Sequence, residues 1–220
     1  MNTYRLSVVG TGYVGLCTAF GFTSKGYKVI AVDIDKQKVY SINRGDIPFY
    51  EANTKELLQK AIIDKNFKCL LNIYEAVLHT DITFVTVGTP SKLDGGINLQ
   101  YIESAAKDIG KALNKKDAYH LIVIKSTVIP NTTEKIVKPI IERNSGKRCG
   151  RDFGLCMNPE FLREGSALYD LLHPDRIIIG EYDQKAGDTL EALYREFYGE
   201  DLPPILRTNL PTAELIKYAN

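Results

Sequence analysis

The chain has 220 residues, and its 28 Lys and Arg residues almost balance its 27 Asp and Glu residues, giving a formal net charge of +1. With 44% hydrophobic and 25% charged residues, the composition is that of an ordinary globular protein, which excludes global disorder, collagen-like repeats and a disulfide scaffold. The balanced charge also argues against nucleic acid as a partner, since nucleic-acid-binding domains usually carry a basic excess.

Targeting and cysteine patterns bear on where the protein works. No stretch reaches the ~20 apolar residues that a membrane span needs, and the N-terminus lacks the pattern of a signal peptide. The cysteines do not follow C-x-x-C spacing, and the three histidines are not placed with them as metal ligands. The sequence therefore predicts a cytoplasmic protein with free thiols, no metal site and no membrane partner.

Short apolar runs alternate with amphipathic segments along the chain. The runs predicted as strands are Leu6–Val9, Lys28–Val32, Cys69–Leu71, Ile82–Val87, His120–Ile124, Phe153–Met157 and Arg176–Ile179. The segments predicted as helices are Tyr13–Lys25, Lys36–Ile42, Thr54–Ile63, Ile73–Leu78, Leu99–Leu113, Thr133–Glu142 and Gln184–Phe197. This alternation predicts an α/β fold, a Rossmann-type, doubly wound, mostly parallel sheet with helices on both faces.

Two more helix starts are predicted in the second half of the chain. Asn158, Pro159 and Glu160 are typical of an N-cap, a first helical position and a first turn, which would place Glu160 and Glu164 on one helix face. A second start lies at residues 211–214, followed by the apolar positions Leu215, Ile216 and Ala219. No C-cap signal precedes the last residue, so we expect this helix to be cut partway in a fragment of a longer protein.

A glycine-rich turn follows the first predicted strand. Gly10, Gly12 and Gly15 form a G-x-G-x-x-G pattern between a strand and a helix, and the second strand ends at Asp33. This context is typical of a dinucleotide site, in which the glycines and the helix N-terminus hold the pyrophosphate. An acidic residue at position 33 would bind ribose hydroxyls and repel a 2′-phosphate, so NAD is favoured over NADP. A plain tight turn and an S-adenosylmethionine site remain the alternatives.

Three polar motifs follow other predicted strands. They are Val-Gly-Thr-Pro-Ser at 87–91, Lys-Ser-Thr-Val-Ile-Pro at 125–130, and Asn-Pro-Glu-Phe-Leu-Arg-Glu-Gly at 158–165. Ligands of open α/β sheets bind at the carboxyl ends of strands, so these motifs are expected to meet the glycine turn in one crevice.

Two further motifs follow these along the chain: His-Pro-Asp-Arg at 173–176 and Ala-Glu-Leu-Ile-Lys-Tyr-Ala-Asn at 213–220. With all of these motifs in this order, the chain resembles the UDP-glucose/GDP-mannose dehydrogenase family. The resemblance covers Leu6 to Asn220 and is strongest to the UDP-glucose 6-dehydrogenases of that family. It implies NAD-dependent oxidation of the C6 alcohol of UDP-glucose to UDP-glucuronate through two hydride transfers. GDP-mannose and a UDP-N-acetylhexosamine remain alternative substrates.

The resemblance also implies roles for individual residues. The expected cofactor-binding residues are Gly10, Gly12, Tyr13, Val14, Gly15, Asp33, Lys38, Thr89, Ser126, Thr127 and Glu164. The expected substrate-binding residues are Glu160, Phe161, Leu162, Arg163, Glu164, Tyr169 and Lys217. The expected catalytic residues are Thr127, which would organise a water, Glu160, an acid/base in the hydrolytic step, and Lys217, which would stabilise negative charge on the reacting oxygen.

Residue chemistry alone leaves plainer alternatives open for these positions. Glu160 could only complement a helix dipole, Thr127 could cap a helix, and Lys217 could be a solvated surface lysine. Arg163 is more often part of a structural ion pair than a substrate contact, and Tyr169 is more often a packing aromatic.

The family reaction passes through a thioester on a cysteine in a glycine-rich motif. Cys17, Cys69, Cys149 and Cys156 do not lie in such a motif. We therefore expect residues 1–208 to form an NAD-binding domain and 209–220 to begin a central helix, with the nucleophile and the substrate domain elsewhere.

The chain alone should bind NAD without completing the oxidation, as a monomer or weak dimer. Its parent should form a homo-oligomer through the central helix. A stand-alone NAD-binding module and a methyltransferase are the competing hypotheses.

Overall fold

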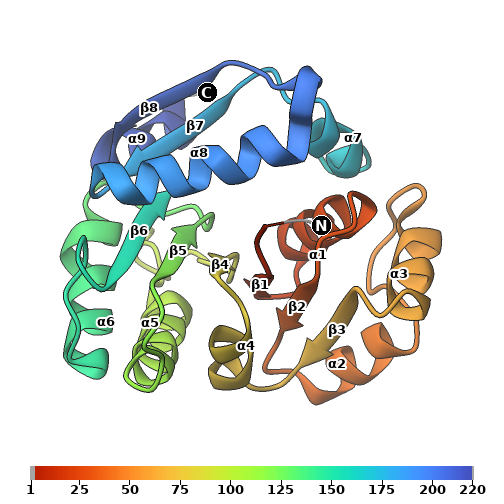
Figure 1. Cartoon of the computed structure of the whole chain (residues 1–220), viewed down its shortest axis with the longest axis horizontal. Helices are drawn as coiled ribbons and strands as arrows, with labels where there is room; N and C mark the ends of the chain where they lie inside the picture. The colour runs from red at the N-terminus through yellow and green to blue at the C-terminus, as the bar shows by residue number, and fades with distance from the viewer. Residues whose placement is uncertain (1–2, 220) are drawn as a thin grey trace.

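The computed structural model describes residues 3–219, within which eight strands form one sheet in the order β3-β2-β1-β4-β5-β6-β7-β8 (Figure 1). The strands are β1 (Leu6–Val9), β2 (Val29–Val32), β3 (Phe67–Leu70), β4 (Ile82–Val85), β5 (His120–Ile124), β6 (Phe153–Met157), β7 (Ile177–Glu181) and β8 (Ile205–Asn209). The first six are parallel, which confirms the predicted α/β class, and each of the seven predicted strands is found.

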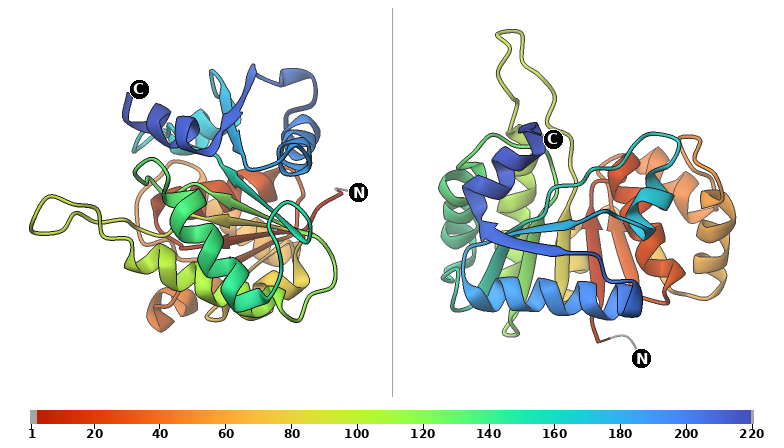
Figure 2. Two further views of the ribbon diagram at one scale, coloured as in Figure 1. Left: turned by 90° about the vertical axis from the view of Figure 1, so that its left-hand side faces the viewer. Right: turned by 90° about the horizontal axis from the view of Figure 1, so that it is seen from above.

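The helices divide between the two faces of the sheet (Figure 2). They are α1 (Tyr13–Ser24), α2 (Lys36–Asn43), α3 (Thr54–Ile63), α4 (Ile73–His79), α5 (Gln100–Leu113), α6 (Lys138–Ser145), α7 (Ala167–Leu172), α8 (Gln184–Tyr198) and α9 (Leu210–Ala219), with a π-helical turn at Thr133–Val137 and a 3₁₀ turn at Gly199–Asp201. Buried side chains of α1, α2, α3 and α8 form one hydrophobic cluster, and those of α4, α5, α6 and α9 form the other.

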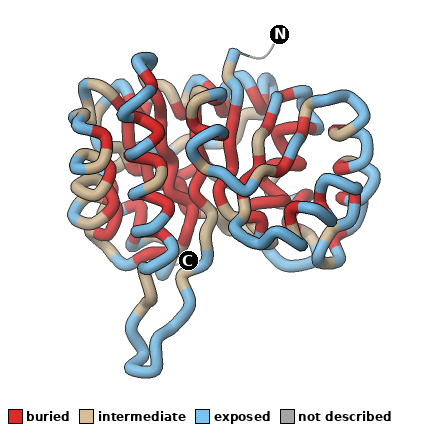
Figure 3. The backbone as a smooth tube through the Cα atoms, turned by 90° about the horizontal axis from the view of Figure 1, so that it is seen from below, coloured by how far each residue is buried: buried red, intermediate tan, exposed pale blue. Residues whose placement is uncertain are grey.

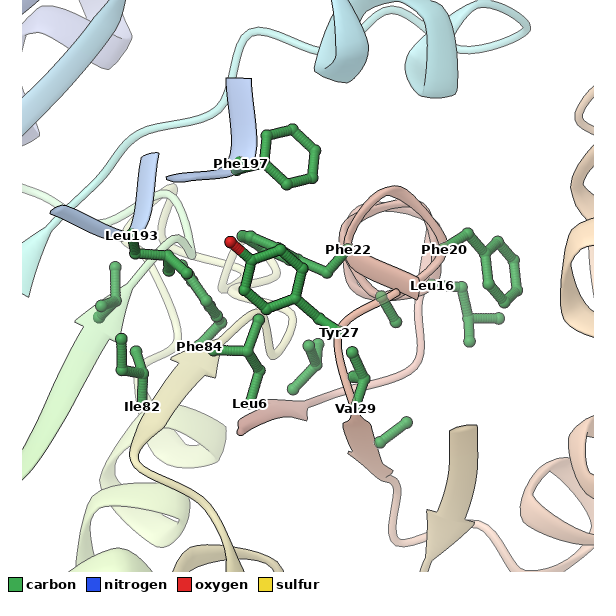
Figure 4. Close-up of a cluster of buried hydrophobic side chains, with 14 of the residues drawn as sticks. Leu6, Leu16, Phe20, Phe22, Tyr27, Val29, Ile82, Phe84, Leu193 and Phe197 are labelled. Atoms are coloured by element: carbon green, nitrogen blue, oxygen red, sulfur yellow. The ribbon is translucent and has the colours of Figure 1, made fainter. Parts of the chain in front are cut away.

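Aromatic rings dominate the first cluster. Phe22 lies at its centre, with ring centroids 5.4 Å from Tyr27, 5.3 Å from Phe84 and 4.9 Å from Phe197 (Figure 4). Such tilted and edge-on aromatic pairs add to the stabilisation from area burial. They join α1 to the centre of the sheet and to α8, so the first and last thirds of the chain share one core.

The last two strands depart from the parallel order. β7 runs antiparallel to β6 and pairs with it only at Cys156↔Glu181 and Met157↔Gly180, whereas β8 runs parallel to β7 along its whole length. Because the β6–β7 overlap is so short, β7 and β8 extend beyond the carboxyl end of β6, together with α8 and α9 (Figure 1, top). This arrangement places α9 near the carboxyl ends of the parallel strands, where the polar motifs lie.

Strand β8 was not predicted from the sequence. Of its five residues only Ile205 and Leu206 are apolar, and Leu206 is exposed, because β8 is the edge of the sheet. Its Arg207 instead forms ion pairs with Glu181 of β7 and with Asp188 and Glu191 of α8. A two-residue apolar run followed by polar residues gives too weak a pattern for a strand.

The predicted helix starting at Asn158 is wrong. Residues 158–163 have no regular structure, and α7 begins only at Ala167. The Asn158 side chain does not cap a helix, since its Nδ2 donates to the Ile178 carbonyl (2.7 Å) inside the sheet. Gly165, at φ +86°, then bends the chain before α7. The helical spacing that would have placed Glu160 beside Glu164 is therefore absent.

The predicted C-terminal helix is confirmed as α9, which begins at Leu210, directly after the last residue of β8. Its Leu210 and Ala213 are buried, whereas Leu215 is half exposed. The expected boundary at 208/209 falls within β8; residues 1, 2 and 220 of the expected domains lie outside the described part of the chain. Beyond the carboxyl end of β4, residues 88–99 project as a loop (Figures 2 and 3), with Leu93 fully exposed.

Candidate functional site

The three glycines that run from the end of β1 into the first turn of α1 have three different surroundings. Gly10 has φ +99°, and a Cβ there would lie 2.9 Å from the Thr86 carbonyl oxygen. At Gly15 a Cβ would lie 1.9 Å from the Gly10 carbonyl oxygen, so a side chain is excluded by helix–strand packing. At Gly12 a Cβ would meet no atom within 4 Å. Gly12 is therefore the glycine that leaves the start of α1 open to a ligand.

The N-terminus of α1 gives this turn its affinity for anions. Gly12 is the N-cap, no side chain caps it, and the first turn contains no acidic residue. The first N–H groups of a helix have no partner within the helix, and the helix dipole favours negative charge there. The turn is thus suited to a pyrophosphate.

Asp33 lies at the end of β2 and faces the same turn. Its Oδ2 accepts hydrogen bonds from the Thr11 N–H (3.0 Å), the Thr11 hydroxyl (2.6 Å) and Lys38 Nζ (3.1 Å), while Oδ1 accepts from the Asp35 N–H (3.1 Å). Burial opposes ionisation of Asp33, but these hydrogen bonds outweigh it and hold its pKa below the usual value. A charged acceptor is therefore maintained where the adenosine ribose of a dinucleotide would lie.

A cleft of 640 Å³ lies along the carboxyl ends of β1, β2, β4 and β5. The expected cofactor residues that line it are Gly10, Gly12, Tyr13, Val14, Asp33, Lys38, Thr89, Ser126 and Thr127. Gly15 packs behind the turn, as its predicted role requires. Hydroxyls fix the rim of the cleft: Ser126 donates to the Val87 carbonyl (2.7 Å), and Thr89 donates to the Thr127 carbonyl (2.7 Å).

The structure adds lining residues that the motif analysis missed. They include Thr86, which directly follows β4, and Tyr101, Ser104 and Asp108 of α5. Ile34 and Ile73 also line the cleft. Ile34 is 79% exposed. A large apolar residue directly after the acidic strand end is a signal that could have identified it. The α5 residues gave no such signal, because only the packing of α5 turns them toward the cleft.

Lys217 of α9 and Glu160 of the 158–166 segment meet beside this cleft. Lys217 Nζ donates to Glu160 Oε1 (2.9 Å) and to the Glu160 main-chain carbonyl (2.6 Å). Glu160 Oε2 accepts from the Leu162 N–H (2.7 Å), and Glu160 lines the cleft wall. Two residues that are 57 positions apart in the sequence are thereby joined as an ion pair with side chains only 21% and 12% exposed.

Lys125 is a further charged group at this point, and it was not singled out from the sequence. It directly follows the fully buried β5, is 7% exposed, and donates from Nζ to Asn158 Oδ1 (2.9 Å). The Tyr194 hydroxyl donates to the same Oδ1 (2.5 Å). Burial and the like charge of Lys217 lower the pKa of Lys125 to about 8, against the opposing effect of Glu160. A lysine that ends an otherwise apolar strand is the sequence signal that could have marked it.

A second cavity of 530 Å³ lies on the other side of Lys125 and Glu160, which line both spaces. The expected substrate residues Phe161, Leu162, Arg163 and Tyr169 line this second cavity. Arg163 also forms a two-point ion pair with Asp170 (Nη2–Oδ1 2.7 Å, Nε–Oδ2 3.1 Å), which is the structural pair left open as an alternative. Glu164 is exposed and lines neither space, so the structure does not bring it to the expected cofactor or substrate contacts.

Tyr13 ties the phosphate-binding turn to the segment that carries Glu160. Its hydroxyl donates to Glu51 Oε2 and accepts the Gly165 N–H (2.6 Å). The other Glu51 oxygen accepts the Leu168 N–H at the start of α7 (3.3 Å). Burial and the Glu51 carboxylate raise the pKa of Tyr13 to about 12, so its hydroxyl stays protonated and keeps both bonds.

The cysteines have surroundings that oppose nucleophilic chemistry. Cys17, Cys69 and Cys156 are buried and Cys149 is partly buried. Burial raises the pKa of Cys17, Cys69 and Cys149 to about 12 and that of Cys156 well above its usual value. The thiolate is the reactive form, so these four side chains are poor nucleophiles at neutral pH. No group of three or more potential metal ligands occurs in residues 3–219.

The site as a whole brings together an uncapped helix start suited to anions, the Asp33 carboxylate and the partly buried Lys217–Glu160 pair along one edge of the sheet. Across residues 3–219, none of the helices has the length and apolar character needed to cross a bilayer.

The model of the UDP-glucose/GDP-mannose dehydrogenase family, NAD binding domain, matches residues 4–198.

Named proteins match over nearly the whole chain. A GDP-mannose 6-dehydrogenase from Pseudomonas syringae is 43% identical over 214 residues, covering 97% of this chain and 48% of the relative. The UDP-glucose 6-dehydrogenase AglM of Haloferax volcanii is 42% identical over 217 residues, covering 98% of this chain and 50% of the relative. The chain therefore spans about half the length of these relatives.

A solved structure shows the same architecture. A ternary complex of GDP-mannose dehydrogenase from Pseudomonas aeruginosa superposes with a TM-score of 0.93 at 41% identity, covering 98% of this chain and 48% of that one.

Proposed function

Because the chain belongs to the UDP-glucose/GDP-mannose dehydrogenase family, as its NAD-binding domain, we propose that the whole protein oxidises the C6 hydroxyl of a nucleotide sugar to a carboxylate. The observation that carries this proposal is the Lys217–Glu160 pair at the wall of the cofactor cleft. Both residues were expected to be catalytic, and a substrate hydroxyl held beside them would be able to approach a nicotinamide bound in the cleft.

Residues of this chain would hold the cofactor without large adjustment. The bare Gly12 and the N-terminus of α1 would receive the pyrophosphate, and Asp33 would accept the ribose hydroxyls. When bound, NAD supplies a hydride acceptor, and oxidation of an alcohol to an acid requires two such transfers together with one oxygen from water. Asp33, already hydrogen-bonded to Lys38, would disfavour the extra phosphate of NADP.

Lys217 and Glu160 divide the remaining chemistry. The Lys217 ammonium would stabilise negative charge on the substrate oxygen as its proton leaves. Glu160, fixed by the Leu162 N–H and by Lys217, would transfer protons in the hydrolytic step. Thr127, at the cleft wall, would organise the water. The thioester-forming cysteine of this scheme would come from residues other than the four in this chain, whose thiols the fold keeps protonated.

The candidate substrates are UDP-glucose, GDP-mannose and a UDP-N-acetylhexosamine, and the first two have equal support from the relatives. UDP-glucose was expected from the motifs, but the GDP-mannose and UDP-glucose relatives are 43% and 42% identical to this chain. NADH formation by the whole protein with UDP-glucose, GDP-mannose and a UDP-N-acetylhexosamine, measured in parallel, would separate them. NAD binding without oxidation of any of these sugars would favour the stand-alone NAD-binding module.

Calorimetric titration of the chain with NAD and with NADP tests the cofactor site. We expect saturable NAD binding and much weaker NADP binding. Asp33→Asn removes one charged acceptor and should weaken NAD by about tenfold, the effect of losing one hydrogen bond to a charged group. Asp117→Asn, an exposed site away from the cleft, should leave the affinity unchanged. Equal affinity for NAD and NADP in the wild-type chain would contradict the role given to Asp33.

A further inference from the structure

Helix α9 carries a carboxylate that is fully buried. Glu214 is 0% exposed and lies three residues before Lys217, so the two side chains are close to one turn apart on the same helix. No sequence pattern distinguishes Glu214 from the exposed acidic residues of other helices. Its burial within an otherwise apolar helix–sheet contact requires partners for both carboxylate oxygens.

Those partners are two main-chain N–H groups from a distant loop. Glu214 Oε2 accepts the Asn131 N–H (2.5 Å), and Oε1 accepts the Thr133 N–H (2.7 Å). Asn131 has φ +74°, a conformation that side-chain-bearing residues seldom adopt, and Thr133 opens the π-helical turn that leads into α6. Glu214 thus caps, from another helix, a helix start in which no side chain of its own forms a cap.

The loop held by Glu214 is the one that leaves β5 and lines the cofactor cleft. Residues 125–131 run from the end of β5 to Asn131 and include Ser126 and Thr127 of the cleft wall. Lys217, on the same helix as Glu214, contacts Glu160 of the segment that follows β6. Helix α9 therefore spans the two strand ends, through the hydrogen bonds of Glu214 at one and the Lys217–Glu160 ion pair at the other.

The charge of Glu214 does not stabilise the fold at neutral pH. Burial raises its pKa above the usual value, although the N–H groups of Thr133 and Asn131 partly offset that effect. An acid whose pKa is raised on folding is harder to ionise in the folded chain than in the unfolded one, so its ionisation opposes folding. The contribution of the carboxylate is geometric, because its two oxygens hold two main-chain N–H groups in position at the same time.

We propose that Glu214 is a positioning residue for the dehydrogenase reaction, which anchors α9 to the loop of Ser126 and Thr127 and so places Lys217 against Glu160 beside the cofactor cleft. The proposal rests on the proposed function for its catalytic meaning. Its structural part, that Glu214 sets the position of Lys217, can be measured on this chain without any turnover.

The measurement is the rate at which Lys217 reacts with acetic anhydride, followed by mass spectrometry and normalised to the exposed Lys107. In the wild-type chain the ion pair with Glu160 should protect Lys217. In Glu214→Gln one acceptor oxygen is replaced by an NH₂ group that faces a main-chain N–H, so α9 loses one anchor. We expect Lys217 to react about tenfold faster, the factor for losing one hydrogen bond to a charged group.

Matched variants separate positioning from general stability. Glu200→Gln makes the same chemical change at an exposed acid and should leave Lys217 protected. Glu214→Leu fills the site with an apolar side chain, which keeps the core packed while removing both anchors. In both Glu214 variants circular dichroism should match the wild-type chain. Because Ser126 and Thr127 of the cofactor cleft lie on the loop that Glu214 holds, any loss of calorimetric NAD affinity should be smaller than the gain in Lys217 reactivity. In the whole protein, kcat should fall by a larger factor than the KM for NAD rises.

Unchanged Lys217 reactivity in a folded Glu214 variant would overturn the proposal. Unfolding of both variants would also overturn it, because Glu214 would then be a general stability group. Failure of the proposed function has a different signature: a wild-type chain that does not bind NAD, whatever the reactivity of Lys217.

Discussion

The glycines of the phosphate-binding turn show how one residue type serves different physical needs within six positions. Gly10 supplies a positive φ, Gly15 removes a side chain from a helix–strand contact, and Gly12 keeps a surface bare for a ligand. The motif on its own predicts all three together. The space around each glycine shows which of these needs it serves. Substitutions can therefore test effects on stability and on ligand binding separately.

Substituting Ala at Gly12 and at Gly15 should therefore give opposite results. At Gly15 the new methyl group would overlap the Gly10 carbonyl, and we expect the free energy of unfolding to fall by about 1–3 kcal/mol, as for overpacked sites. At Gly12 stability should be kept, but NAD should bind about tenfold more weakly, a change of 1.4 kcal/mol in binding free energy. Urea denaturation and calorimetry on both variants would show this. Normal NAD binding by Gly12→Ala would contradict the pyrophosphate position.

At the level of secondary-structure elements, the packing of helix α9 on strand β7 sets the position of Lys217. The helix packs so closely on β7 that a Cβ at Gly180 would lie 2.5 Å from the Cβ of Ala213 and 3.1 Å from the Asn209 carbonyl oxygen. Gly180 is also one of the two β7 residues that pair with β6. A single small residue thus joins the antiparallel extension of the sheet to the helix that carries Glu214 and Lys217.

The substitution Gly180→Ala should loosen this contact. We expect the free energy of unfolding to fall by about 1–3 kcal/mol, because the clash involves backbone and a Cβ that cannot rotate away. Gly88→Ala is the control, since a Cβ at Gly88 would meet no atom within 4 Å. Urea denaturation of both variants measures the difference. Equal stability of the two would show that α9 does not depend on close approach to β7.

At the scale of the whole molecule, a buried polar network crosses the sheet far from the cofactor cleft. Lys116 Nζ donates to His120 Nδ1 (2.9 Å), His120 Nε2 bonds the Thr83 hydroxyl (2.7 Å), and Thr83 bonds Ser7 (2.7 Å). Burial, followed by the charge of Lys116, lowers the pKa of His120 to about 3. A protonated His120 could not accept from Lys116, so the network requires a neutral imidazole.

This network predicts acid sensitivity of folding. The His120 pKa is depressed in the folded chain, so between its ordinary value near 6.5 and about 3 the unfolded chain binds the proton more tightly. Stability is then lost as the pH falls, by about 2 kcal/mol at pH 5. Urea denaturation of the wild-type chain and of His120→Gln at pH 7 and pH 5 would measure it, and the variant should lose less. Asp33 and Asp81, whose pKa values are also lowered, act only below pH 4.

Local sequence patterns were enough to predict several features of the fold. Seven strands, the glycine turn with Asp33, and helix α9 were predicted from apolar runs and motif spacing, because buried parallel strands and phosphate turns depend on neighbouring residues. Lys217 was identified through the family resemblance. The sequence also predicted that the polar motifs meet at one edge of the sheet, because the carboxyl ends of parallel strands lie side by side.

The remaining features depend on contacts between residues that are far apart in the sequence. The edge strand β8 owes its place to β7 and to the ion pairs of Arg207, and its own sequence is too polar to show it. Residues 158–163 stay irregular because Asn158 bonds Ile178 and Lys125 instead of capping a helix. The burial of Lys125 and Glu214 depends in the same way on partners at least 33 and 81 positions distant. Contacts between residues so far apart leave no local pattern, so packing alone reveals them.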